Sequence, residues 1–229
     1  FFELLERDAV LTHWLCKRPM LEIVPESLPH AIRDWAQTEL AQSPRFQRLR
    51  VLVADQGYFP AVTVLLQSTD SFGAISHASD GSLDKAVYRA LSEASRIAQL
   101  VEHPELIQSS ASLVEMNPPM KAILPDDHAA VYAHHLPVPE WLFGPQAEWA
   151  TAARAWNDRA RGLSADQLGL KFHVVAKAPL VVGYATSHLV QHLYFGRTKE
   201  AASQGWLNLE RLRSVMPTGD FNPLPHFVP

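Results

Sequence analysis

Two short apolar runs on either side of Gly57 constrain the fold of this chain more than any other feature. Residues 50–55 read Arg-Val-Leu-Val-Ala-Asp, and residues 61–66 read Ala-Val-Thr-Val-Leu-Leu. Runs of this length, rich in Val and Leu, predict strands that are buried on both faces. Helical patterns precede and follow them, so the sequence predicts an α/β fold with a mixed sheet and packed helices.

The first helical segment extends from residue 2 to about residue 17, where side chains repeat at spacings of three and four. Its two sides differ in character. One side carries Leu4, Leu5, Asp8, Leu11, Thr12 and Leu15, and the other carries Glu3, Glu6, Arg7, Val10 and Trp14. Pro29 suits the first turn of a second helix, which carries Ile32, Trp35, Ala36 and Leu40.

A loop rich in Gly, Ser and Asp, residues 71–81, is predicted to lead into the clearest helix of the chain. Ser82 suits the N-cap of that helix, because its hydroxyl oxygen can accept a bond from a backbone N–H of the first turn. Arg89, Glu93 and Arg96 share a face at spacings of four and three, apart from the apolar stripe. Beyond this helix, the pattern predicts Pro- and His-rich loops over 103–145, a helix over 146–161, and strands over 171–177 and 180–184.

The composition is that of an ordinary globular protein, and it excludes several classes of function. The 229 residues suffice for one large domain, predicted to span 1–229, and the formal net charge is -4 without a basic block. Nucleic acid is therefore not an expected partner, because phosphate binding needs a concentrated positive face. The longest apolar runs are strand-sized, so no membrane span is expected. Cys16 is the single cysteine, which excludes a Cys-based zinc cluster and fits a cytoplasmic location.

Glu3 and Glu6 lie one helical turn apart and point the same way, with Arg7 beside them. Two carboxylates at that separation repel each other unless a cation lies between them. Mg²⁺ is a usual solution, since it takes oxygen ligands and links carboxylates to phosphates. The alternative is a solvated acidic face with an intrahelical ion pair, and spacing alone favours that alternative.

Three weaker patterns accompany this one. The backbone N–H groups of the Gly-rich loop, together with Arg89, suit an anion, but a capped core helix explains the same pattern. His188 and His192 have the spacing of two metal ligands on one helix face, yet the sequence offers no obvious third ligand, which favours ordinary histidines. Cys16 lies late in a Leu-rich helix, where a buried thiol is typically inert.

In their order along the chain, three stretches resemble the YcaO family of ATP-dependent enzymes that modify peptide backbone amides. Phe-Glu-Leu-Leu-Glu-Arg-Asp-Ala followed by Trp14 resembles the family's Glu-x-x-Glu-Arg-Asp-Ala helix. Residues 73–93 resemble its Gly-rich loop and Ala-x-x-Arg-Ala-Leu-x-Glu helix, through Ala86, Arg89, Ala90, Leu91 and Glu93. The ending, residues 222–229, resembles its Pro-rich C-terminus, and Asp127-His128 with Tyr132 resembles a segment of azoline-forming members.

The resemblance implies a YcaO-like fold whose helices place glutamates around Mg²⁺ and the phosphates of ATP. Glu3 and Glu6 would be Mg²⁺ ligands, and Glu93 would complete the nucleotide site. Arg7 and Arg89 would lie near phosphate. A Cys, Ser or Thr side chain of a ribosomally made precursor peptide would attack the preceding carbonyl, and ATP would phosphorylate the resulting oxygen. Elimination would then give a thiazoline or an oxazoline.

The resemblance also implies a role for the tail and a set of partners. The tail would project into the active site, where Pro223, Pro225 and Pro229 would assist proton transfer. The expected partners are the precursor peptide, an E1-like peptide-binding protein and an FMN-dependent dehydrogenase that oxidises azolines to azoles. The expected assembly is a hetero-oligomer, a homodimer or both.

Three departures from the family pattern shape these expectations. The family's upstream ATP motif with Ser and Glu is missing and the first residue is not Met, so we expect the C-terminal portion of a longer protein. Arg96 stands where the family usually has Gln. The tail is not Pro-x-Pro-x-Pro, which keeps thioamide and amidine formation as alternatives. A non-catalytic scaffold subunit that keeps the fold is the remaining alternative.

Overall fold

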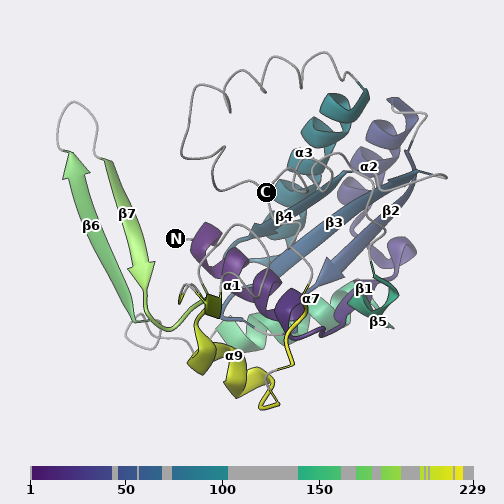
Figure 1. The fold of residues 1–229 in the computed structure, drawn as a ribbon. Helices are drawn as coiled ribbons and strands as arrows, with labels where there is room; N and C mark the ends of the chain where they lie inside the picture. The colour runs from purple at the N-terminus through teal and green to yellow at the C-terminus, as the bar shows by residue number, and fades with distance from the viewer. Residues whose placement is uncertain are drawn as a thin grey trace.

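The structure is a computed structural model in which a five-stranded sheet lies between two layers of helices (Figure 1). It describes residues 2–42, 46–55, 57–68, 74–102, 139–160, 169–176, 182–191, 202–203, 205, 207–218 and 220–223. The described helices are α1 (Phe2–Leu15), α2 (His30–Gln42), α3 (Leu83–Glu102), α7 (Trp149–Ala160) and α9 (Leu209–Val215). The described strands are β1 (Met20–Ile23), β2 (Phe46–Val53), β3 (Ala61–Ser68), β4 (Ile75–Ser79), β5 (Phe143–Ala147), β6 (Leu170–Ala176) and β7 (Val182–Ser187).

The main sheet has the strand order β4-β3-β2-β1-β5, and it is mixed, as predicted. Strand β1 pairs in parallel with β5, whereas the other neighbours are antiparallel. The parallel pair requires a glycine, because a Cβ atom at Gly144 would lie only 2.5 Å from the Met20 carbonyl oxygen. Strands β6 and β7 form a separate antiparallel hairpin that extends away from the main sheet (Figure 1).

The two predicted apolar runs are strands β2 and β3, and their alternate side chains fill two separate cores. Val51, Val53, Val62 and Val64 face the layer of α2, α3 and α7. On the other face, Leu52, Ala54, Ala61 and Leu65 pack against α1 and Leu212 of α9. Because each fully buried Val or Leu contributes about 1.5–3 kcal/mol, burial on both faces fixes these strands between the helical layers.

Two predictions about the elements need correction. Residues 75–79 lie in the predicted Gly-rich loop, yet they form strand β4. Strand β3 provides the hydrogen-bonding partner for that backbone, so pairing outweighs the small polar side chains. Residues 143–147 form β5, and the predicted helix over 146–161 therefore begins only at Trp149. Val10 and Trp14, which the pattern places on the same side of α1 as Glu3, Glu6 and Arg7, are both buried.

The other predicted helices and strands are confirmed where the structure describes them, whereas residues 103–138, most of the predicted loop region, lie outside the described residues. Helix α2 follows Pro29 as expected, and Ser82 caps α3, since its Oγ accepts from the backbone N–H of Lys85 at 3.4 Å. The expected pair of strands near residues 171–184 corresponds to β6 and β7. Among the helices of the described ranges, none has both the length and the apolar character needed to span a membrane.

Candidate functional site

The N-terminal end of α1 meets the start of α3 beside β4, at one edge of the main sheet. Phe2 makes this contact, because its ring lies 3.8 Å from the position of a Cβ atom built on Gly81, just before α3. The Phe2 ring also packs edge-on against Phe59, with ring centroids 5.5 Å apart. This packing sets the first two turns of α1, which carry Glu3, Glu6 and Arg7, near the exposed face of α3, which carries Arg89 and Glu93.

Glu3 forms an intrahelical ion pair with Arg7, and the distance from Glu3 Oε1 to Arg7 Nη2 is 2.5 Å. The Glu3 side chain is 68% exposed, whereas that of Arg7 is 31% exposed. The spacing predicted this pair as one of two alternatives. The pair leaves the Glu3 carboxylate accessible to solvent, because the contact is with a single Oε1 atom.

Glu6 is the most perturbed carboxyl group of this region. Burial is the largest cause and raises the pKa of Glu6 to about 7. The negative charge of Glu93, and to a smaller extent that of Glu3, raises this pKa further. The positive charge of Arg7, and to a smaller extent that of Arg89, lowers it. A half-buried carboxyl group that titrates near neutrality is typical of a site that binds a cation or moves a proton.

Glu93 belongs to the same electrostatic cluster. Burial raises the pKa of Glu93, the nearby Arg96 and Arg89 lower it, and the charge of Glu3 raises it. Glu3 and Glu93 each raise the pKa of Glu6, so the three carboxylates from α1 and α3 share one patch of negative potential. Helical spacing predicted that Glu3 and Glu6 lie together, and the fold brings Glu93 of α3 beside them.

Arg89 is anchored at the end of β4. Its Nη1 donates to the Ser79 carbonyl oxygen and to Asp80 Oδ2, each at 3.2 Å. Its side chain is still 52% exposed, so part of the guanidinium remains open to solvent beside the carboxylates. Part of the predicted Gly-rich loop is the edge strand β4, in which alternate backbone groups of residues 75–79 pair with β3 and are not available to an anion.

The carboxylates of this patch suit Mg²⁺ that is also bound to a phosphate. Within the described ranges, no three side chains of His, Cys, Asp or Glu approach closely enough to enclose a metal ion. Mg²⁺ does not require such a cage, since it is usually held by one or two carboxylates, phosphate oxygens and water. Two glutamates of α1 with adjacent guanidinium groups therefore suit Mg²⁺ that arrives bound to a phosphate.

The C-terminal segment is fastened to the opposite end of α1. The backbone N–H of Asn222 donates to the Leu15 carbonyl oxygen at 2.7 Å, and Asn222 is buried. Pro223 follows and is exposed. The other two predicted catalytic prolines, Pro225 and Pro229, lie outside the described residues, as do Asp127, His128, Tyr132 and His192.

Sequence reasoning missed the role of Asp8, which lies in the apolar stripe of α1 and is buried. Arg211 of α9 contacts it twice, from Nη2 to Oδ2 at 3.0 Å and from Nε to Oδ1 at 3.2 Å. The backbone N–H of Gln191 donates to Asp8 Oδ1 at 2.7 Å, and Gln191 Oε1 accepts from the backbone N–H of Asn208 at 2.7 Å. A carboxylate within an apolar stripe was the available signal, because a buried charge needs a partner.

Two other predicted residues behave as ordinary structural groups. Cys16 is buried, and burial raises the pKa of its thiol to about 11, which favours the predicted inert thiol. His188 lies in a turn after β7 rather than on a helix, so it does not share a helix face as its spacing suggested.

Asp55 lies between His13 and Arg18. The hydrogen bond with His13 is the main reason why the pKa of Asp55 is lowered to about 2.

Comparisons with known proteins bear on this site. The family model described as YcaO cyclodehydratase, ATP- and Mg²⁺-binding, matches residues 1–172. A heterocyclase solved in complex with substrate and cofactor is 18% identical, with a TM-score of 0.51 over 98% of this chain and 30% of its own. A chain of the E. coli microcin synthetase McbBCD complex with pro-MccB17 bound is 14% identical, with a TM-score of 0.46 over 81% of this chain and 48% of its own. No curated protein matched the sequence. The chain thus spans less than half the length of either solved chain.

Proposed function

The chain belongs to the YcaO family of cyclodehydratases, and from this premise we propose that it converts Cys, Ser or Thr residues of a ribosomally made precursor peptide to azolines. The family binds ATP and Mg²⁺, which are the cofactors expected from the sequence. One observation supports the proposal most directly. Carboxylates and guanidinium groups from α1 and α3 gather at one sheet edge, where burial and the charge of Glu93 raise the pKa of Glu6 to about 7.

The residues of this patch divide into two roles in the proposal. Glu3 and Glu6 hold Mg²⁺, and Glu93 completes the site from α3. Arg7 and Arg89 lie beside these carboxylates and neutralise phosphate charge. Bound Mg²⁺ would supply charge neutralisation at the phosphates, which phosphoryl transfer requires more than a protein nucleophile.

The reaction removes one water equivalent from the peptide. The sulfur or oxygen of the side chain loses its proton and forms a bond to the preceding backbone carbonyl carbon, and the amide nitrogen loses its proton as the C=N bond forms. The former carbonyl oxygen leaves as phosphate, and ATP supplies the phosphoryl group. The protein's own contribution is to hold the reacting groups together and to exclude water.

The tail is proposed to take part in this chemistry through Pro223, Pro225 and Pro229. Its anchor at Leu15 lies about 14 Å along α1 from Glu6, because an α-helix rises about 1.5 Å per residue. The residues from Asn222 to the last proline are enough to span roughly 23 Å when extended. The tail is therefore long enough to bring Pro229 to the carboxylates, whereas Pro223 and Pro225 can reach only about 4 and 11 Å from the anchor.

The proposed partners are the precursor peptide, an E1-like peptide-binding protein and an FMN-dependent dehydrogenase. They follow from family membership alone. The proposal is tested by expressing the protein with a short Cys- and Ser-rich peptide encoded beside its gene. Mass spectrometry should detect loss of one water mass per modified residue, whereas exchange of oxygen for sulfur would indicate thioamide formation instead.

A further inference from the structure

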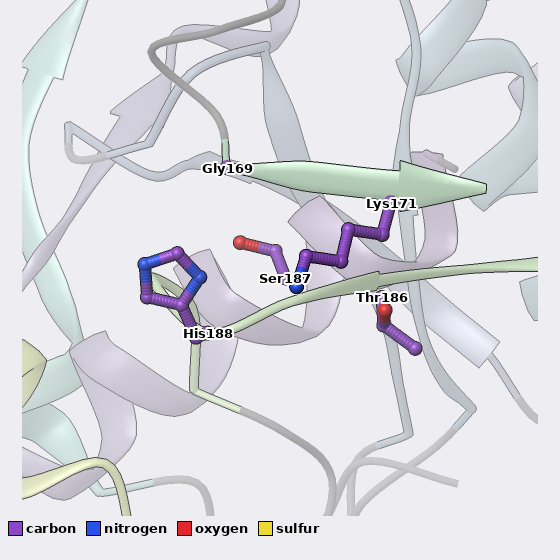
Figure 2. Close-up of a pocket in the computed structure, with 5 residues that line it drawn as sticks. All are labelled: Gly169, Lys171, Thr186, Ser187 and His188. Atoms are coloured by element: carbon purple, nitrogen blue, oxygen red, sulfur yellow. The ribbon is translucent and has the colours of Figure 1, made fainter.

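A hollow of about 270 Å³ lies at the base of the β6–β7 hairpin, and Figure 2 shows the residues that line it. They are Gly169, Lys171, Thr186, Ser187 and His188. None of these five residues belongs to α1 or α3, so the hollow is lined by none of the glutamates or arginines assigned to Mg²⁺ and phosphate. A contact that bears on those assigned residues lies instead between β4 and α3, where Asp80 pairs with Arg89.

Asp80 connects the end of β4 to the start of α3, and both oxygens of its carboxylate accept hydrogen bonds. Oδ1 accepts from the backbone N–H of Gly81 at 2.7 Å, and Oδ2 accepts from Arg89 Nη1 at 3.2 Å. The Asp80 side chain is only 17% exposed, whereas about half of the Arg89 side chain is exposed. Asp80 is therefore the fixed partner of this pair, and Arg89 is the partner that reaches solvent.

Helical spacing offers Arg89 a second acidic partner. Glu93 lies four residues after Arg89 on α3, and opposite charges at this separation commonly form an ion pair. Within the described residues, Arg89 pairs instead with Asp80, and it also donates to the Ser79 carbonyl oxygen. Both bonds draw the guanidinium toward β4 at the N-terminal end of α3, and so away from Glu93.

The charge of Arg89 still acts on the carboxylates of the candidate site. Burial is the largest cause of the raised pKa of Glu6 and of Glu93, and the charge of Arg89 lowers the pKa of both. Arg89 thus favours the ionised carboxylates from a distance, while its hydrogen bonds go to β4 and Asp80. Carboxylate oxygens that no guanidinium occupies remain accessible to Mg²⁺.

We propose that Asp80 is a positioning residue, which holds Arg89 away from Glu93 so that the guanidinium is presented to phosphate and the Glu93 carboxylate stays accessible to Mg²⁺. The phosphate contact rests on the proposed function, whereas the hold of Asp80 on Arg89 does not. A long side chain that is already held loses less conformational freedom when its ligand arrives, so the expected benefit is in affinity.

Asp80→Asn separates this role from a structural one, because the Asn side-chain oxygen can still accept from Gly81 while the charge that holds Arg89 is lost. The first measurement is the pH titration of the Glu93 carboxyl group in the nucleotide-free full chain, by NMR of isotope-labelled glutamate with Glu93→Gln to assign the signal. Arg89 released from Asp80 should pair with Glu93, so the pKa of Glu93 should fall. In an Arg89→Gln background, Asp80→Asn should change that pKa far less.

The second measurement is the affinity for a non-hydrolysable ATP analogue with Mg²⁺, by titration calorimetry without peptide. Asp80→Asn should weaken binding about twofold to tenfold, the range for one long side chain that must be ordered on binding. The substitution should have no further effect in the Arg89→Gln background. Asp84→Asn removes the same charge from the exposed first turn of α3 and should bind the analogue as the wild type does.

A Glu93 pKa that does not fall in Asp80→Asn would overturn the proposal. A loss of affinity that is equally large in the Arg89→Gln background would also overturn it, since Asp80 would then act through the backbone of α3. Asp80→Ser, whose hydroxyl can also accept from Gly81, repeats both measurements as a second uncharged variant, and thermal unfolding verifies that each variant is folded. A wild-type protein that binds no ATP analogue would contradict the proposed function, and the Glu93 titration would still decide whether Asp80 holds Arg89.

Discussion

Asp8 of α1 and Arg211 of α9 form a two-point ion pair across 203 residues of the chain, with distances of 3.0 and 3.2 Å. The Asp8 side chain is 1% exposed and that of Arg211 is 16% exposed. This pair joins the helix that carries the candidate Mg²⁺ ligands to the C-terminal part of the chain. It therefore fastens α1 to α9, in addition to the contacts with α3 at the α1–α3 patch, which consists of Glu3, Glu6, Arg7, Arg89 and Glu93.

Removal of one partner of this pair should be costly. Asp8→Asn keeps the shape of the side chain but leaves the Arg211 guanidinium buried without a counter-charge, which costs about 3 kcal/mol. For a chain of this size the melting temperature should fall by about 6–12 °C. Differential scanning calorimetry measures this change, with Asp220→Asn at an exposed position as the control. Equal melting temperatures for the two variants would show that the pair contributes nothing.

The raised pKa of Glu6 predicts a gain of stability on substitution. The pKa of Glu6 is about 7 in the folded protein and near 4.5 in the unfolded chain, so its contribution to stability is lost as pH rises between those values. Above pH 7 the folded protein must hold a half-buried carboxylate. Glu6→Gln should therefore stabilise the metal-free protein at pH 8 by about 1–2 kcal/mol, and by much less at pH 4. Urea unfolding tests this, and destabilisation at pH 8 would indicate a structural role for Glu6.

The same pKa predicts how Mg²⁺ binding depends on pH. A protonated Glu6 cannot ligate Mg²⁺, so protons compete with the metal below pH 7. The affinity for Mg²⁺ with a non-hydrolysable ATP analogue should fall by about tenfold between pH 8 and pH 6, since each pH unit below the pKa lowers the ionised fraction by about tenfold. Titration calorimetry at the two pH values measures it. Affinity that does not change with pH would exclude Glu6 as a ligand.

The tail is predicted to act in cyclisation rather than in nucleotide binding. Deletion of residues 225–229 keeps the Asn222 anchor on α1, so the fold should be retained. Cyclisation of the peptide should then be lost far more than ATP binding. Rates of azoline formation and affinities for ATP, measured on the same truncated protein, separate the two effects. Equal losses would indicate a purely structural tail.

The sequence predicted those parts of the fold that depend on local patterns. Residues 51–53 and 61–66 form strands because their apolar side chains can be buried only between two helical layers. Ser76, His77 and Ser79 favour a loop on their own, yet β3 pairs with them. The Ser76 hydroxyl also donates to the Ala90 carbonyl oxygen of α3 at 2.5 Å. Such partners are distant in sequence, so β4 could not be predicted from its own residues.

The candidate site, too, could be predicted only where it depends on local sequence patterns. Glu3, Glu6 and Arg7 were predictable as a group, because helical spacing alone brings them together. The pKa of Glu6 depends on burial and on Glu93 of another helix, which only the fold brings near. The apolar stripe of α1 suggested that Asp8 is buried. Its ion pair could not be predicted, because the partner, Arg211, lies on α9.

The most direct test of the central claim, that the α1–α3 carboxylates serve Mg²⁺ and ATP, is the rate of Mg²⁺-dependent ATP hydrolysis in the presence of the peptide substrate. Glu6→Gln should lower this rate on the order of a hundredfold or more, as expected for loss of a group that stabilises transition-state charge. The variant should remain folded by thermal unfolding, and Glu210→Gln on the exposed face of α9 should keep the wild-type rate. A folded Glu6→Gln protein that hydrolyses ATP at the wild-type rate would contradict the assignment of this site.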